Sequence, residues 1–304
     1  MTLDRRQFLR LSALAVPLTV PLLSACGGDD DPKTGDTPPT IDNSLALEQI
    51  GNDYANGLRI GSGESELVVG TSRFSFGILD PTDGPVTDAD VTVYAGRSAK
   101  APALATAKAR WIKEGVEDKA LYVADLPFPA AGEWLVAVLA VDQHGAKTRG
   151  GLAVDVKATS PSPVKGQRAI STPTPTTAKP AGADPLCSRV AGACSMHAIS
   201  LDAALKNGKP TVITFSAPAF CQTETCGPVV DIVDAIAKEK AGAMNFIHVE
   251  AFVNQGKALA KPLTAWKFTS EPWTYFIDSK GVVSDRISGA LGSAEVRDRV
   301  AKLS

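Results

Sequence analysis

The sequence contains little histidine, few aromatic side chains and no cluster of basic residues. Its 304 residues include 3 histidines, and aromatic residues make up 6% of the chain. Acidic side chains slightly outnumber basic ones, 33 to 31, and no segment gathers lysine and arginine as nucleic-acid binding requires. The histidines are spread over the whole chain and form no recognisable metal-binding motif. We therefore expect no nucleic-acid partner, no metal and no cofactor.

A long apolar run that could serve as a permanent transmembrane helix is also lacking. The stretch from Leu11 to Leu23 is short and interrupted by proline. It follows the twin-arginine pattern Asp4-Arg5-Arg6-Gln7-Phe8-Leu9 and closes on Leu23-Ser24-Ala25-Cys26, which resembles a bacterial lipobox. We expect residues 1–25 to be a signal peptide and Cys26 to be lipidated, which would anchor the mature chain outside the bacterial cell membrane.

Five cysteines are an odd number for an exported protein. If Cys26 carries a lipid, four remain, and they form the pairs Cys187 with Cys194 and Cys221 with Cys226. An oxidising compartment permits disulfides in both pairs.

The first of these pairs lies just before the last predicted domain. We expect Cys187 and Cys194 to form a structural disulfide that staples this segment. A second redox pair, which exchanges with the first, is the alternative. Met196 and His197 next to Cys194 also suggest soft-metal binding, which we treat as a minor alternative because no histidine cluster is visible.

Composition divides the chain into two folded parts. The 279 residues that follow residue 25 exceed one typical domain. Residues 26–56 begin with a segment rich in Gly, Asp, Pro and Thr and are predicted to be a tether, and residues 159–186 are predicted to be a Pro/Thr/Ala-rich linker. The fold class expected is multidomain, with an all-β domain over 57–158 and an α/β domain over 187–304.

The first part has the pattern of a β-sandwich. Seven short runs with alternating apolar residues are separated by turn residues, which is typical of two packed antiparallel sheets. The run from Tyr122 to Val138 resembles the late strands of bacterial immunoglobulin-like domains. No catalytic constellation is visible here, so we expect a spacer or a protein-interaction module.

The second part alternates helices and strands. The predicted elements, in chain order, are helix 201–206, strand 210–216, helix 228–240, strand 243–249, helix 258–266, strands 273–277 and 282–287, and helix 295–303.

Two motifs in this part resemble the thioredoxin superfamily, most closely its extracytoplasmic TlpA-like branch. The run Val212-Ile-Thr-Phe-Ser-Ala-Pro-Ala-Phe-Cys221 is similar to the strand that leads to the first active-site cysteine, and Thr269 to Val283 is similar to the cis-proline strand and hairpin. The resemblance covers residues 196–303. It implies a thioredoxin-like fold, a redox pair of Cys221 and Cys226, and a cis-proline at Pro272 that helps to position a substrate backbone.

The spacing of Cys221 and Cys226 departs from that family, because four residues separate them where the family has two. Either Cys221 attacks and Cys226 resolves, or Cys226 attacks from the start of the helix. Gly227 and Pro228 favour a helix that begins there, which puts Cys226 nearest the positive end of the helix dipole. We therefore expect Cys226 to have the lower thiol pKa, with Glu224 opposing thiolate formation through its like charge.

These features predict a membrane-anchored extracytoplasmic thiol-disulfide oxidoreductase. Its partners would be protein thiols or disulfides, or a redox partner protein. The alternative is a non-catalytic lipoprotein that acts as a binding or scaffold module with structural disulfides, and a copper-delivery role is a third hypothesis. The direction of the reaction stays open.

Overall fold

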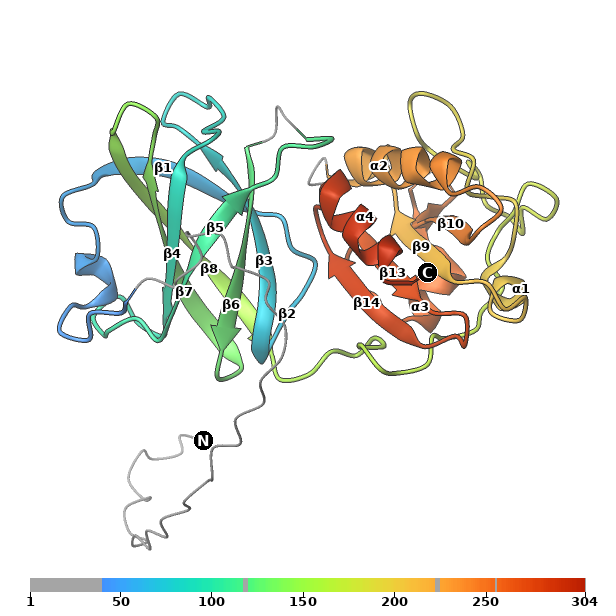
Figure 1. Ribbon diagram of the computed structural model, residues 1–304, viewed down its shortest axis with the longest axis horizontal. Helices are drawn as coiled ribbons and strands as arrows, with labels where there is room; N and C mark the ends of the chain where they lie inside the picture. Colours follow the sequence, from blue (N-terminus) through green and yellow to red (C-terminus); the bar gives the residue numbers. More distant parts are fainter. Residues whose placement is uncertain (1–39, 117–119, 222–224, 255, 304) are drawn as a thin grey trace, which may run out of the picture. The chain divides into compact units, whose positions relative to one another are not determined.

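Figure 1 shows the computed structural model, which describes residues 40–116, 120–221, 225–254 and 256–303. The predicted signal peptide (1–25) and lipidation site Cys26 lie outside the described residues. Among the described residues, no helix is long and apolar enough to span a membrane.

The first folded part is a closed β-barrel. Its strands are β1 (Ala55–Ser62), β3 (Gly70–Leu79), β4 (Asp90–Gly96), β5 (Ala105–Trp111), β6 (Leu121–Phe128), β7 (Gly132–Val141) and β8 (Lys147–Lys157), with the short β2 (Leu67–Val68) beside β8. They follow the order β1-β3-β6-β5-β4-β7-β8, and β8 pairs in parallel with β1 to close the ring.

This ring modifies the sandwich predicted from the sequence. The sequence predicted two packed sheets, whereas the sheets of the seven barrel strands are joined at both sides. The β1–β8 pairing forms one junction, and β5 forms the other because it pairs with β4 over residues 105–109 and with β6 at Arg110 and Trp111.

Period-two patterning fills the barrel interior as expected. Phe74, Phe76 and Ile78 on β3 are fully buried, and so are Tyr122 on β6 and Trp134 on β7. Alternate residues of a strand point to one face, so the intervening positions of β3 are more polar. Burying each such side chain contributes about 1.5–3 kcal/mol.

Part of the predicted tether belongs to the folded structure. A short 3₁₀-helix, Leu47–Gln49, precedes the barrel, and Leu47 and Ile50 are buried against Ala103 and Leu139. The tether predicted over 26–56 is therefore too long at its C-terminal end. Burial of these two apolar side chains contributes free energy that they would not contribute in a solvated tether.

The predicted linker likewise packs against the second part. Gly166 donates its backbone N–H to Val283, whose own N–H bonds to Gln167, and Arg168 bridges to Val282. The Ser162 hydroxyl donates to the carbonyl of Trp266. Composition predicted a linker, but the backbone of this segment forms hydrogen bonds along the edge of a sheet.

The second part is a four-stranded sheet between helices, drawn in yellow to red in Figure 1. Its elements are α1 (Leu201–Ala204), β9 (Thr211–Ser216), α2 (Cys226–Glu239), β10 (Asn245–Glu250), α3 (Lys261–Ala265), β13 (Trp273–Ile277), β14 (Val283–Ser288) and α4 (Ser293–Ala301). The strand order is β10-β9-β13-β14, with β9 and β10 parallel and β13 antiparallel to both β9 and β14.

The predicted elements agree with these, with one shift. The predicted helix 258–266 begins later, because Ala258–Leu259 forms a strand, β12, that pairs with β11 (Phe252–Val253). Helix α3 then starts with Pro262 in its first turn, where the missing N–H costs nothing.

Helices cover both faces of the sheet. Apolar residues of α2 and α4 share one core cluster with Val212, Phe246 and Phe276. Residues of α1 and α3 share another with Ile213 and Tyr275. Neighbouring positions on β9 and β13 thus face opposite helical layers, which explains why both strands are buried throughout.

A buried ion-pair cluster joins the barrel to this second part. Arg73 on β3 donates to both carboxylate oxygens of Glu295 on α4, at 2.9 and 2.7 Å, and its guanidinium also contacts Glu64 at 3.3 Å. The Arg73 side chain is only 12% exposed. Arg110 contacts Glu295 from the barrel side at 3.2 Å.

Candidate functional site: two thiol centres

The first thiol centre lies where β9 leads into α2. A tight turn after β9 places Cys221, whose backbone N–H donates to Ala217 at 2.9 Å. Cys226 is the first residue of α2, with Thr225 at the N-cap. The spacer residues 222–224, including Glu224, lie outside the described residues. Both cysteines are thiols in the structure and form no disulfide with each other.

Burial distinguishes these two sulfurs. Cys226 is fully buried, whereas Cys221 is partly exposed. The Cys226 thiol forms a hydrogen bond with Cys221, and this bond and burial together raise the pKa of Cys226. The hydrogen bond to Cys221 and burial act against the sequence prediction that Cys226 is the more acidic thiol, which rested on the helix dipole.

The predicted proline follows Glu271, whose carboxyl group lies near this centre. The Glu271–Pro272 peptide bond is cis, as the sequence predicted. The carbonyl of Pro272 accepts the N–H of Gly289 at 2.8 Å and the Ser65 hydroxyl at 3.0 Å. The second donor comes from the loop after β1, so the barrel contacts the strand that carries the proline.

Glu271 brings a carboxyl group to the same place. One of its oxygens and the sulfurs of Cys221 and Cys226 lie within 4.8 Å of one another. Burial raises the pKa of Glu271, and the negative charge of Cys221 raises it further. The structure thus places Glu271 half-buried beside the thiols.

An apolar cavity of about 310 Å³ adjoins the start of α2. Its lining includes Thr225, Pro228, Val229, Leu79, Val116 and Leu291. These residues come from both folded parts, so an apolar group of a bound molecule could lie near the first thiol centre.

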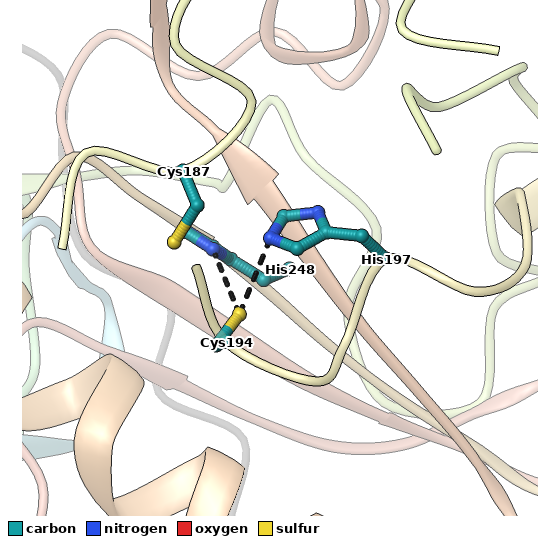
Figure 2. A group of neighbouring side chains, drawn as sticks. All are labelled: Cys187, Cys194, His197 and His248. Atoms are coloured by element: carbon teal, nitrogen blue, oxygen red, sulfur yellow. Dashed lines mark hydrogen bonds between the residues drawn. The ribbon is translucent and has the colours of Figure 1, made fainter. Parts of the chain in front are cut away.

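The second thiol centre consists of Cys187, Cys194, His197 and His248, drawn in Figure 2. One ligand atom from each residue lies within 4.8 Å of the others. The Cys194 sulfur is 3.2 Å from Nε2 of His197 and 3.4 Å from Nδ1 of His248, and both dashed lines in Figure 2 meet at this sulfur. The sequence prediction that the histidines form no cluster is wrong for this pair.

A long-range contact between a loop and β10 creates this cluster. Cys187, Cys194 and His197 belong to one loop, whereas His248 lies on β10. The N–H of His248 donates to the carbonyl of Met196 at 2.9 Å, which holds the loop against the strand. The Cys-x6-Cys-x2-His spacing was a local signal in the sequence, but the fourth member could be found only from the fold.

The tautomer of His248 follows from its neighbour. Its Nε2 is 3.2 Å from the carbonyl oxygen of Ser216, which can only accept a hydrogen bond. In the neutral ring, Nε2 therefore carries the proton and Nδ1 presents a lone pair toward Cys194. Nδ1 of His197, on the far side of its ring, is buried and has no hydrogen-bond partner among the described residues.

Buried acidic groups fix the loop that carries the cysteines. Asp234 on α2 accepts hydrogen bonds from the N–H and the hydroxyl of Ser195, at 2.8 and 2.6 Å, and from Arg189 at 2.8 Å. Burial opposes its ionisation, but Lys238, Ser195 and Arg189 outweigh burial and lower the pKa of Asp234 to about 2. On the other side, Glu250 accepts the N–H of Ser188 at 2.7 Å.

Cys187 and Cys194 are free thiols in the structure. The Cys194 thiol donates to Cys187, which lowers the pKa of Cys187; the same bond and burial raise the pKa of Cys194. The predicted Cys187–Cys194 disulfide stays a prediction.

No family model matches the sequence, and no curated protein matches it either. Solved structures with similarity include the thiol:disulfide interchange protein DsbE from Chlorobium tepidum, 12% identical with a TM-score of 0.33, which covers 47% of this chain and 99% of its own. A thioredoxin family thiol:disulfide interchange protein from Chlorobium tepidum TLS is 20% identical with a TM-score of 0.28, covering 44% and 99%.

A third solved structure, CopC from Methylosinus trichosporium OB3b, is 13% identical with a TM-score of 0.24 and covers 34% of this chain and 97% of its own. TM-scores this low support no inference about activity. The elements β9, α2, β10, α3, β13, β14 and α4 follow one another in the chain order predicted for the thioredoxin-like part. Part of the chain has a thioredoxin-like fold.

Proposed function

We propose that this protein is an extracytoplasmic thiol-disulfide oxidoreductase that acts on protein thiols or disulfides through Cys221 and Cys226. The observation that carries the proposal is the pairing of a partly exposed sulfur with a fully buried one at the start of α2. An accessible nucleophile and a protected resolving thiol are what disulfide exchange requires.

In the reducing direction, the thiolate of Cys221 attacks one sulfur of a substrate disulfide. A mixed disulfide forms, and the other substrate sulfur leaves as a thiolate and takes up a proton. Cys226 then gives up its proton and attacks the Cys221 sulfur, which releases the second substrate thiol. The substrate disulfide is reduced to two thiols, and the Cys221–Cys226 pair is oxidised to a disulfide; the reverse sequence oxidises a substrate.

Two neighbouring groups support these steps. Cys226 must lose a proton before it resolves the mixed disulfide, and the half-buried carboxyl of Glu271, whose pKa is raised, lies within reach to accept it. Pro272 stands next to Glu271, where it would help to position the substrate backbone. The apolar cavity beside Pro228 would hold an apolar side chain of the substrate.

The N-terminal segment and the barrel would bring this thiol centre close to its substrates. Lipidation at Cys26 would anchor the chain to the bacterial cell membrane from outside, and residues 27–39 would supply reach. The barrel over 57–158 would be an immunoglobulin-like module that serves as a spacer or docks a partner protein. Its contact with Pro272 through Ser65 favours a role in presenting substrate.

The direct test is disulfide exchange by the purified chain with insulin as substrate. We expect reduction of insulin in the presence of a thiol reductant, loss of this activity in Cys221→Ser, and a trapped mixed disulfide on Cys221 in Cys226→Ser. Full exchange by the Cys221→Ala/Cys226→Ala variant would contradict the proposal. A reduction potential for this pair well below about −300 mV would favour the alternative, a scaffold with a structural bridge.

A further inference from the structure

The second thiol centre has no role in the exchange just described. Four side chains with metal-ligating atoms converge there from a loop and from β10, and two of the chain's 3 histidines are among them. We propose that Cys187, Cys194, His197 and His248 form a tetrahedral site for a resident Zn²⁺ ion.

The donor set favours zinc. Two thiolates and two imidazoles are among the commonest ligand combinations of structural zinc sites. Four protein ligands leave no open position for substrate or water, which is typical of an ion that stabilises a fold rather than one that reacts or is handed on. Two thiolates also neutralise the ion, so the occupied site carries no net charge into the protein interior.

The distances agree with this coordination. Bonds of about 2.3 Å to sulfur and 2.1 Å to nitrogen, at tetrahedral angles, place a sulfur and a nitrogen about 3.6 Å apart. The Cys194 sulfur lies 3.2 Å from Nε2 of His197 and 3.4 Å from Nδ1 of His248, so an expansion by a few tenths of an ångström would accommodate the ion.

The surroundings orient the ligands in advance. The Ser216 carbonyl holds the proton of His248 on Nε2 and leaves Nδ1 as the donor atom, which is the hydrogen-bonding pattern that metal-binding histidines usually have. Asp234 and Glu250 fix the loop through Ser195 and Ser188, the residues that follow Cys194 and Cys187. Zinc binding would release the protons of both thiols and close the segment that the sequence predicted as disulfide-stapled.

Cobalt titration of the reduced full chain, under anaerobic conditions, tests the site. We expect one Co²⁺ per chain, with the visible absorption of tetrahedral cobalt and a thiolate-to-cobalt band in the near ultraviolet, and displacement of this ion by one equivalent of Zn²⁺. The spectrum should be kept in Cys221→Ser/Cys226→Ser, which separates this site from the redox pair and from the proposed function. It should also be kept in His144→Gln, because His144 is the exposed third histidine.

The spectrum should be lost in Cys194→Ser and in His248→Gln. If Cys194→Ser fails to fold, His197→Gln tests the same ligand set with a change that preserves ring-sized volume. An unchanged cobalt spectrum in these variants, its loss in Cys221→Ser/Cys226→Ser, or the absence of stoichiometric binding would overturn the proposal. So would peptide mapping that finds Cys187 joined to Cys194 by a disulfide in the chain isolated without reductant.

Discussion

Ser216 accepts the Nε2–H of His248 through its carbonyl oxygen at 3.2 Å. The hydroxyl of the same serine donates to the carbonyl of Cys226 at 3.1 Å. Ser216 ends β9, the strand between the two thiol centres, and it is fully buried. Its backbone therefore orients one centre while its side chain supports the first turn of the helix that carries the other.

The variant Ser216→Ala separates these two roles. It removes the hydroxyl and one donor to the Cys226 carbonyl but keeps the backbone carbonyl that binds His248. We expect a loss of about 1 kcal/mol in the free energy of unfolding, measured by urea denaturation, with the Co²⁺ spectrum of the second centre unchanged. A changed cobalt spectrum with unaltered stability would contradict this division of roles.

The two sulfurs of the first centre should differ in reactivity. Cys226 is fully buried and its pKa is raised, so little of it is thiolate near neutral pH. In the reduced chain, we expect iodoacetamide to label Cys221 at least ten times faster than Cys226 at pH 7, as measured by mass spectrometry of single-cysteine peptides. Faster labelling of Cys226 would reverse the proposed assignment of attacking and resolving thiol.

Glu271 should restrain the reactivity of Cys221. Repulsion between the two charges acts on both groups, and it contributes to the raised pKa of Glu271. We expect Glu271→Gln to increase the alkylation rate of Cys221 severalfold at pH 8, where the carboxylate is ionised, and the difference to shrink as the pH falls through the raised pKa of Glu271. The exposed Glu133 supplies a matched control, since Glu133→Gln should leave the rate unchanged.

Replacing Arg73 should lower the free energy of unfolding more than replacing an exposed arginine of the same barrel. Its guanidinium contacts Glu295 and Glu64 in a setting where all three side chains are at most 12% exposed. We expect Arg73→Ala to cost about 3–5 kcal/mol, because the Glu295 carboxylate and the Glu64 carboxyl group lose their buried partner. Arg59→Ala, which breaks an ion pair with Asp83 at the surface, should cost less than about 1 kcal/mol. Both free energies of unfolding would be measured by chemical denaturation, and equal losses in the two variants would contradict this prediction.

Because of Glu64, the free energy of unfolding should decrease as the pH rises from mildly acidic to neutral. Burial raises its pKa from the ordinary 4.5 to about 7, although Arg73, Ser288 and Ser75 oppose the shift. Between these two values the folded chain holds a proton that the unfolded chain has lost, so the contribution to folding is full below about pH 4.5 and is lost as the pH rises through about 7.

The matching measurement compares Glu64→Gln with the unchanged chain from pH 5 to pH 8. Glutamine does not ionise. Over this pH range, the free energy of unfolding of the variant should therefore decrease by up to about 3 kcal/mol less than that of the unchanged chain. Glu48→Gln, at an exposed position, should follow the unchanged chain. Identical pH profiles for Glu64→Gln and the unchanged chain would count against the buried, protonated carboxyl.

Local patterning in the sequence was sufficient for most elements. Alternating residues such as Phe74, Phe76 and Ile78 predicted the strands, and Gly227 with Pro228 predicted the start of α2 to within two residues. The thioredoxin-like arrangement and the cis bond before Pro272 followed from residues close together in the chain.

The features that could not be predicted from the sequence depend on contacts between residues far apart in the chain. The parallel pairing of β1 with β8 joins the first and last barrel strands, and nothing in either strand specifies it. His248 reaches Cys194 only through the packing of β10 beneath the loop. The Pro-rich segment was predicted to be a linker from its composition, which carries no information about the backbone groups that pair with Val283.

Closure of the barrel has a consequence for encounters between copies of the chain. Each of its seven strands has a hydrogen-bonded neighbour on either side, and the backbone of 166–169 covers part of the outer edge of β14. Open strand edges act as templates for pairing between molecules and for aggregation. A barrel whose strands are all paired offers no such template to a neighbouring copy of the chain.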